Sequence, residues 1–143
     1  MRKVILLMLT LCLGLTACQG GNDKTNESQT AQKDGVEVLY FHGKQRCATC
    51  MAIEQEAKAV VSGQFADAVK GGKLIFRVID ITKAENEAIA DKYEITWSSL
   101  VVVQHKGGKE QAENLTKFAF ANARSKPDVF RSELAKKING WLK

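Results

Sequence analysis

Apolar runs separated by polar and glycine-containing breaks divide most of this chain into short elements. Val36–Phe41 has the β-branched and aromatic content of a buried strand, and Ala52–Val61 is rich in strong helix formers. Leu74–Ile81 and Leu100–His105 have the same strand character, and both are predicted to be buried. Between them, Glu85–Tyr93 has the pattern of a short helix. The first half of the pattern therefore alternates strands with helices.

Turn signals complete the pattern toward the C-terminus. Lys106–Lys109 contains two adjacent glycines, so we expect the preceding strand to fold back on Glu110–Asn114 as a hairpin edge. Ser125–Asp128 resembles a capping box with proline in the first helical turn. The apolar residues that follow at helical spacing are Phe130, Leu134, Ile138, Trp141 and Leu142. They predict a final helix with an apolar core face, whereas Leu115–Arg124 is the stretch that the pattern places least well.

The predicted order of elements is β-α-β-α-β-β-α over residues 36–143, which indicates the α/β class. About 108 residues are enough for a single domain. A domain of this size buries roughly 60 to 70% of the surface that its unfolded chain exposes. No internal repeat divides the segment, so we expect one domain. The protein is expected to be a monomer.

The N-terminal segment has the features of an export signal. Met1–Lys3 carries two positive charges and Val4–Leu15 is almost wholly apolar. This apolar run is too short for a membrane helix, which needs about 20 residues. Leu15-Thr16-Ala17-Cys18 resembles the lipobox of bacterial lipoproteins, which implies that residues 1–17 are removed and that Cys18 is acylated. The alternative is a plain signal peptide in which the cysteine is incidental.

Residues 18–35 are expected to form the lipidated cysteine and a flexible tether. Beyond Cys18 the segment is polar and contains no large apolar side chain to bury, which is typical of disorder. A flexible coil of this length has a root-mean-square reach of roughly 20 to 25 Å. The prediction is a protein anchored by lipid on the periplasmic side of the bacterial cell envelope, at either the inner or the outer membrane.

The charge of the chain argues against nucleic acid as a partner. The formal net charge is +5, and removal of the signal segment takes away two of the positive charges. The remaining lysines are scattered, and no basic run is interleaved with aromatic residues. We therefore interpret the lysines as solvated surface residues.

The four cysteines have different expected fates. Cys12 is removed with the signal and Cys18 carries lipid, which leaves Cys47 and Cys50 as a C-x-x-C pair. Disulfides persist in the compartment to which the chain is exported. The pair is therefore the one position in the mature chain where a reversible intramolecular disulfide is expected.

The first predicted helix is expected to begin at the cysteine pair, so Cys47 lies at its N-terminus. This position affects the reactivity of the thiol. The unpaired N–H groups and the partial positive charge of a helix N-terminus favour a thiolate over a thiol. Lys44 and Arg46 are expected to act in the same direction. Cys47 is then the attacking sulfur, and Cys50, one turn further into the helix, resolves the mixed disulfide. Thr49 is a weaker candidate that could donate its hydroxyl to the thiolate.

Two other interpretations of the pair remain open. As a structural disulfide it would close so short a loop that it would stabilise the fold by only roughly 2 kcal/mol. As a carrier, Cys47 and Cys50 beside His42 and Met51 could bind a soft ion, such as Cu(I), Zn(II) or trivalent arsenic, for delivery to a transporter. The chain lacks a second C-x-x-C or a C-x-x-H to complete a four-ligand site, so no metal is predicted under the leading interpretation.

Element order, spacing and the cysteine pair together resemble the thioredoxin superfamily along residues 36–143. The resemblance implies a three-layer α/β/α fold around a mixed four-stranded sheet. More narrowly, Tyr40–Gly43 followed by Arg46–Cys50 and Ile53-Glu54 is similar to the thioredoxin-like lipoproteins of the ArsF family, labelled as a nitrophenyl compound nitroreductase subunit. That label implies electron transfer, and the family resemblance also implies a permease-like membrane partner. It does not establish a nitro compound as substrate.

The sequence departs from the thioredoxin pattern at two places. The superfamily usually has a cis-proline before the third strand, where this chain has Trp97-Ser98-Ser99-Leu100, and Ser98 is the best match. A hydroxyl or backbone N–H there could face the sulfurs. Thioredoxins also bury an acid on the first strand, and Val38–Phe41 offers none. His42 is the nearest titratable group and could take the proton from Cys50, although packing alone would also account for it.

Trp97 could lie against the active site, with a place in the core or at its rim as the alternative, and His105 is expected at the surface near the hairpin. The leading hypothesis is a membrane-tethered thiol–disulfide oxidoreductase whose redox group is the Cys47–Cys50 disulfide. No G-x-G-x-x-G follows a strand, so no flavin or nicotinamide cofactor is expected. Its expected partners are protein thiols or disulfides, together with a membrane-embedded dithiol carrier or permease.

Overall fold

A computed structural model describes residues 33–143 of the chain. The predicted signal segment, the lipidation site Cys18 and almost all of the predicted tether lie outside the described residues. Within residues 33–143, no helix is both long enough and apolar enough to cross a membrane.

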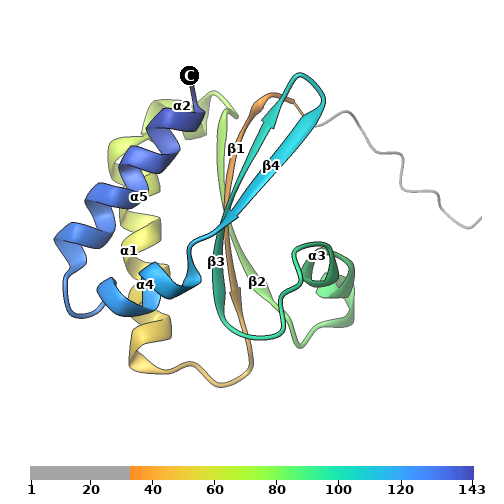
Figure 1. Ribbon diagram of the computed structural model, residues 1–143, viewed down its shortest axis with the longest axis vertical. Helices are drawn as coiled ribbons and strands as arrows, with labels where there is room; N and C mark the ends of the chain where they lie inside the picture. Colours follow the sequence, from red (N-terminus) through yellow and green to blue (C-terminus); the bar gives the residue numbers. More distant parts are fainter. Residues whose placement is uncertain (1–32) are drawn as a thin grey trace, which may run out of the picture.

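The centre of the fold is a mixed sheet with the strand order β2-β1-β3-β4 (Figure 1). The strands are β1 (Gly35–His42), β2 (Leu74–Asp80), β3 (Ser99–Lys106) and β4 (Lys109–Asn114). β1 is parallel to β2 and antiparallel to β3, and β3 and β4 form the predicted antiparallel hairpin. In the turn, Gly107 and Gly108 have φ values of 59° and 74°, which glycine adopts without steric cost.

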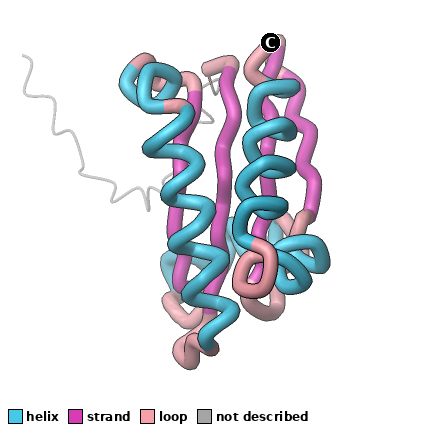
Figure 2. Tube along the Cα trace, turned by 90° about the vertical axis from the view of Figure 1, so that its left-hand side faces the viewer, coloured by secondary structure: helices cyan, strands magenta, loops and turns pink. Residues whose placement is uncertain are grey.

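Helices cover both faces of the sheet, which confirms the three-layer prediction. They are α1 (Ala48–Gln64), α2 (Ala66–Lys70), the 3₁₀ turn η1 (Ala84–Asn86), α3 (Glu87–Lys92), α4 (Thr116–Asn122) and α5 (Pro127–Trp141). Figure 2 shows α1 and α5 side by side in front of the sheet, and Figure 1 shows α3 on the other side. The stretch that the sequence pattern placed least well contains α4.

Alternation along β1 sends side chains into two separate cores. Val38 and Tyr40 face α1 and α5, where they pack with residues such as Ile53 and Phe130. Leu39 and Phe41 face the layer of α3, in a smaller cluster with Ile79, Ile95 and Val101. Because β1 is a central strand with helices over both faces, it is apolar on both faces and its interior is buried.

The strand predicted at Leu74–Ile81 is present as β2, but the prediction that it is buried is wrong for much of its length. Leu74 and Ile79 are buried, whereas Ile75 and Val78 are 44% and 42% exposed. The reason is the sheet order, since β2 is an edge strand that pairs with β1 alone. An apolar run does not distinguish an edge strand from a central one.

Two smaller predictions are corrected near the C-terminus and the hairpin. Lys126, not Ser125, is the N-cap of α5, and the Ser125 hydroxyl donates to the carbonyl of Ala121 at 2.9 Å. His105 is buried rather than at the surface. Its Nε2 lies 3.1 Å from a carboxylate oxygen of Glu37 on the neighbouring strand, so this buried histidine interacts with a carboxylate.

Candidate active site

The candidate site lies where β1 ends and α1 begins. After His42 the chain turns through residues 43–46, and Cys47 becomes the N-cap of α1 with extended backbone angles (φ −75°, ψ 166°). The Cys47 sulfur accepts the backbone N–H of Cys50 at 3.2 Å, which satisfies one of the free donors of the helix end. The predicted position of Cys47 at a helix N-terminus is confirmed.

The two thiols differ in exposure. Cys47 is exposed, whereas Cys50 is buried, with 6% of its surface exposed, and both are free. Hydrogen bonding from the Cys50 thiol, followed by bonds from the backbone N–H groups of the first turn, lowers the pKa of Cys47 below its ordinary value. Thr49 contributes its backbone N–H to this effect. Its predicted hydroxyl contact with the thiolate is not among the hydrogen bonds of the described residues.

The two cations before the cysteine pair have a different role from the predicted one. The main causes of the lowered pKa of Cys47 are the hydrogen bonds, not the charges of Lys44 or Arg46. Lys44 is exposed. Arg46 forms an ion pair with Glu54, and its guanidinium carbon lies 5.8 Å from the centroid of the Tyr40 ring. Arg46 therefore packs against the strand below the site.

Tyr40 is a residue of the site that the sequence interpretation missed. Its side chain is fully buried, and its hydroxyl donates to the carbonyl of Cys50 at 2.8 Å. Burial raises the pKa of Tyr40 to about 12. The alternation along β1 could have indicated this, since it places Tyr40 on the sheet face that α1 covers, just before the cysteine turn.

His42 lies at the end of β1, opposite Asp80 of β2 in the strand register. Its Nδ1 is 2.9 Å from the carbonyl oxygen of Gly43, and its ring stacks on that of Tyr40 with centroids 6.2 Å apart. Within residues 33–143, His42 forms no hydrogen bond to the sulfur of Cys47 or Cys50. His42 therefore lies near the base of the turn, where its ring packs against that of Tyr40.

Trp97 and Ser98 precede β3 at the same end of the sheet as His42, because Ser99 pairs with Phe41 in the register. Trp97 is 56% exposed, so it lies at the surface rather than in the core. Its ring is 5.3 Å from that of Phe120 in α4, centroid to centroid. Ser98 is half-buried, at the position where the resemblance indicates a cis-proline.

Metal-binding residues do not gather at this site. Among residues 33–143, no group of three or more histidine, cysteine, aspartate or glutamate side chains is arranged to hold a metal ion. The two thiols are the strong soft ligands of the site, and the exposed Met51, next to Cys50 in the sequence, carries a weaker thioether.

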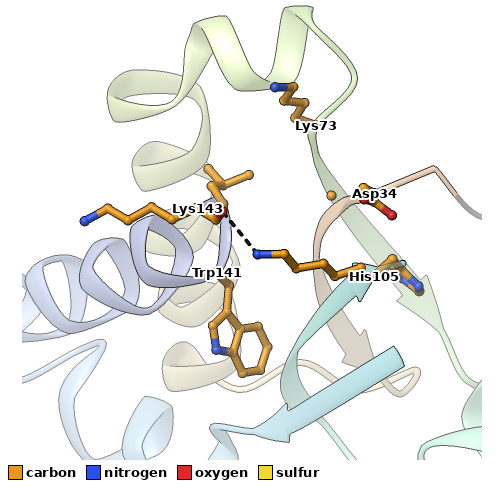
Figure 3. Close-up of a pocket in the computed structure, with 8 residues that line it drawn as sticks. Asp34, Lys73, His105, Trp141 and Lys143 are labelled. Carbon is orange, nitrogen blue, oxygen red and sulfur yellow. Dashed lines mark hydrogen bonds between the residues drawn. The ribbon is translucent and has the colours of Figure 1, made fainter. Parts of the chain in front are cut away.

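A cavity of about 180 Å³ lies at the other end of β1, beside Gly35, and is shown in Figure 3. Lys73, His105, Trp141 and the C-terminal Lys143 are among the residues that line it. The ammonium of Lys106 donates a hydrogen bond of 3.2 Å to the main-chain oxygen of Lys143. Figure 3 marks this bond with a dashed line. The length of β1 separates this cavity from the cysteine pair, so it is not part of the candidate site.

No protein-family model and no curated protein matches the sequence. Solved structures do resemble it. A thioredoxin from Thermus thermophilus is 16% identical, with 72% of this chain and 73% of that chain covered and a TM-score of 0.45. An uncharacterised thioredoxin-like protein from Clostridium perfringens is 14% identical, with 79% and 76% covered and a TM-score of 0.49. The protein titled Trxlp from Edwardsiella tarda is 13% identical, with 73% and 85% covered and a TM-score of 0.47.

These likenesses are too distant to carry a function to this chain, and the assignment of the fold rests on its own topology. The sheet has the order β2-β1-β3-β4, in which β1 and β2 are parallel and β3 is antiparallel to both of its neighbours, β1 and β4. α1 and α5 cover one face, and α3 covers the other (Figure 1). The chain has a thioredoxin-like α/β fold, with a C-x-x-C pair at the start of its first helix.

Proposed function

We propose that this protein is a membrane-tethered, extracytoplasmic thiol–disulfide oxidoreductase. The observation that carries the proposal is the pairing of an exposed N-cap thiol, Cys47, with the buried thiol of Cys50, whose backbone N–H donates to the Cys47 sulfur at 3.2 Å. The thiolate is the nucleophile in disulfide exchange, and the lowered pKa of Cys47 increases its thiolate fraction at neutral pH. The buried partner is protected until a mixed disulfide has formed.

The reaction begins when the Cys47 thiolate attacks one sulfur of a partner disulfide. A bond forms between Cys47 and that sulfur, the partner's S–S bond breaks, and the second partner sulfur leaves with the electron pair and takes up a proton. Cys50 then displaces the first partner sulfur, so the partner is reduced and the Cys47–Cys50 pair is oxidised. The same steps in reverse oxidise a partner dithiol. The relative stability of thiolate and disulfide sets the direction, at about 1.4 kcal/mol per 30 mV.

His42 is our candidate for the group that accepts the proton of Cys50. A carbonyl oxygen can only accept a hydrogen bond, so the contact with Gly43 places the proton of neutral His42 on Nδ1. Nε2 then carries the lone pair that could take a proton. Trp97 and Ser98 are the proposed partner-facing residues, since they precede β3 at the same end of the sheet.

The location and partners are proposed from the N-terminal sequence and the family resemblance. Lipid on Cys18 would hold the domain on the periplasmic side of the bacterial envelope, as in the ArsF-like lipoproteins that the sequence resembles. Outside the cytoplasm a reducing role needs a donor. A membrane-embedded dithiol carrier, or a permease-like protein of the kind the resemblance implies, would supply the electrons. Protein thiols or disulfides are the acceptors.

The first experiment separates an oxidoreductase from a carrier of soft ions. In detergent, the protein should reduce the disulfides of insulin when supplied with dithiothreitol, and Cys47→Ser should abolish this activity. Cys18→Ser is the matched control, because it removes a cysteine outside the redox pair and should leave turnover unchanged. Absent turnover with stoichiometric binding of Cu(I) or arsenite to Cys47 and Cys50 would favour the carrier instead.

The second experiment addresses the membrane. In a bacterium that processes the protein, Cys50→Ser removes the resolving sulfur, so a mixed disulfide through Cys47 should accumulate. Mass spectrometry of the trapped species should identify an integral membrane protein; recovery of soluble proteins alone would refute a membrane donor. Cys18→Ser should lose palmitate labelling, and a variant that still labels would refute the lipid anchor.

A further inference from the structure

Tyr40 is a buried polar side chain directly below the cysteine pair. It lies on β1 with none of its side chain exposed, and its hydroxyl donates to the carbonyl oxygen of Cys50 at 2.8 Å. This bond joins the central strand to the first turn of α1. It therefore fixes the peptide of Cys50, the residue from which the buried thiol projects.

The ring of Tyr40 is itself held in place from several sides. The guanidinium carbon of Arg46 lies 5.8 Å from the ring centroid, and the ring of His42 stacks at 6.2 Å. Arg46 also pairs with Glu54, which follows Cys50 by about one turn of α1. A buried ring with these neighbours has little freedom to rotate its hydroxyl away from Cys50.

The hydroxyl acts as a hydrogen-bond donor and not as a base. Burial, followed by the charge of the nearby Cys50 thiolate, raises the pKa of Tyr40 to about 12. At neutral pH the phenol stays protonated and uncharged. Its effect on the reaction must therefore come from where it holds Cys50, not from transfer of its own proton.

We propose that Tyr40 is a positioning residue for Cys50, and that its hydroxyl holds the Cys50 peptide so that the buried sulfur can attack Cys47. The inference rests on the proposed oxidoreductase function. In the step concerned, the Cys50 thiolate attacks the Cys47 sulfur of the mixed disulfide. The Cys47–Cys50 bond forms as the bond from Cys47 to the partner breaks, and the partner sulfur leaves with the electron pair. The proton lost by Cys50 is taken up by His42, and the leaving sulfur takes up a proton from solvent.

This role makes a specific kinetic prediction, because attack by Cys47 does not require Cys50 to be in place. Tyr40→Phe keeps the ring and removes only the hydroxyl. We expect resolution by Cys50 to slow about three- to tenfold, the factor that corresponds to the loss of one ordinary hydrogen bond. The first attack by the exposed Cys47 should change less than about twofold.

The test uses the full chain in detergent with Cys12 and Cys18 replaced by serine, so that Cys47 and Cys50 are the remaining thiols. On reaction with 5,5′-dithiobis(2-nitrobenzoate), attack by Cys47 releases one thionitrobenzoate and resolution by Cys50 releases a second. Stopped-flow absorbance separates the two releases. The reduction potential of the pair, measured by equilibration with glutathione, is the second readout, since a change in general stability alone would not move it.

The matched control is Tyr93→Phe, because Tyr93 also donates through its hydroxyl, to Glu110 at 3.2 Å, and packs on the opposite face of the sheet. The inference predicts a slower second release and a shifted potential in Tyr40→Phe, with neither change in Tyr93→Phe. An unchanged second release in Tyr40→Phe, or equal slowing in both variants, overturns the inference and leaves the proposed function standing. A parent protein that never releases the second thionitrobenzoate overturns the proposed function as well.

Discussion

Thr116 supports the start of β3, and removal of its hydroxyl should have a measurable cost in stability. Its side chain is buried, and its hydroxyl oxygen accepts the backbone N–H of Leu100 at 3.1 Å. Leu100 is fully buried near the start of β3, two residues after Ser98. Thr116→Val keeps the branched shape but removes the acceptor. The buried N–H of Leu100 is then left unpaired, at a cost of about 1 to 3 kcal/mol.

Urea denaturation followed by circular dichroism would measure this loss as a lower free energy of unfolding with an unchanged m-value. For a domain of this size each kcal/mol lowers the Tm by roughly 4 °C, so we expect a decrease of about 4 to 12 °C. Thr82→Val is the control, because the Thr82 hydroxyl donates to Asp80 at an exposed site. It should change the free energy by less than about 0.5 kcal/mol. Equal stability of Thr116→Val and the parent protein would refute the reasoning.

Two further predictions concern the thiol and the core. The rate of Cys47 alkylation by iodoacetamide should reach half its maximum at a pH below that of an ordinary thiol. Cys50→Ala should move this midpoint upward, because the Cys50 thiol is the first cause of the lowered pKa of Cys47. An unmoved midpoint would show that the helix N-terminus lowers the pKa instead. Phe130→Ala removes a fully buried ring from α5 and should lower the free energy of unfolding, measured in urea, by about 3 to 5 kcal/mol. Val129 is 45% exposed, so Val129→Ala should lower the free energy of unfolding far less.

The sequence predicts the cysteine site well because the signals that define it are local. The apolar run of β1, the turn after His42 and the helix formers after Cys50 follow one another along the chain. These neighbouring signals place Cys47 at the N-terminus of the helix. Gly107 and Gly108 predict the hairpin in the same way, since the turn needs positive φ at both positions.

Features that depend on which strands and helices meet could not be predicted in the same way. Ile75 belongs to an apolar run, and its exposure follows from the edge position of β2, which is a property of the whole sheet. His105 is buried on β3, an interior strand of the sheet, with Glu37 of the neighbouring strand beside it. The segment of α4 is short, and its helix is fixed in part by the Thr116 hydroxyl, which accepts the N–H of Leu100 in β3. Tertiary contacts decide each of these cases.

The same dependence explains why the electrostatics of the site differ from the sequence expectation. Charges that are close in sequence, such as Arg46 beside Cys47, suggest a direct effect on the thiol. In the fold, Arg46 pairs with Glu54 of α1, and its charge is not among the main causes of the lowered pKa of Cys47. What remains to favour the Cys47 thiolate is the hydrogen bonding of the first helical turn and of Cys50.

In the proposed tethered domain, the tether and the cysteine pair lie at opposite ends of β1. The described chain enters the sheet at Gly35, and the cysteine turn follows the other end of the strand at His42 (Figure 1). A strand of this length spans roughly 25 Å. A tether from a lipid on Cys18 would join the domain at the Gly35 end of β1, opposite the cysteine turn. An acceptor in solution could then meet Cys47 directly, whereas a donor within the membrane requires the domain to turn over. The residues between Cys18 and Gly35 must be long enough for that rotation, which makes the length of this segment a functional property under the proposed mechanism.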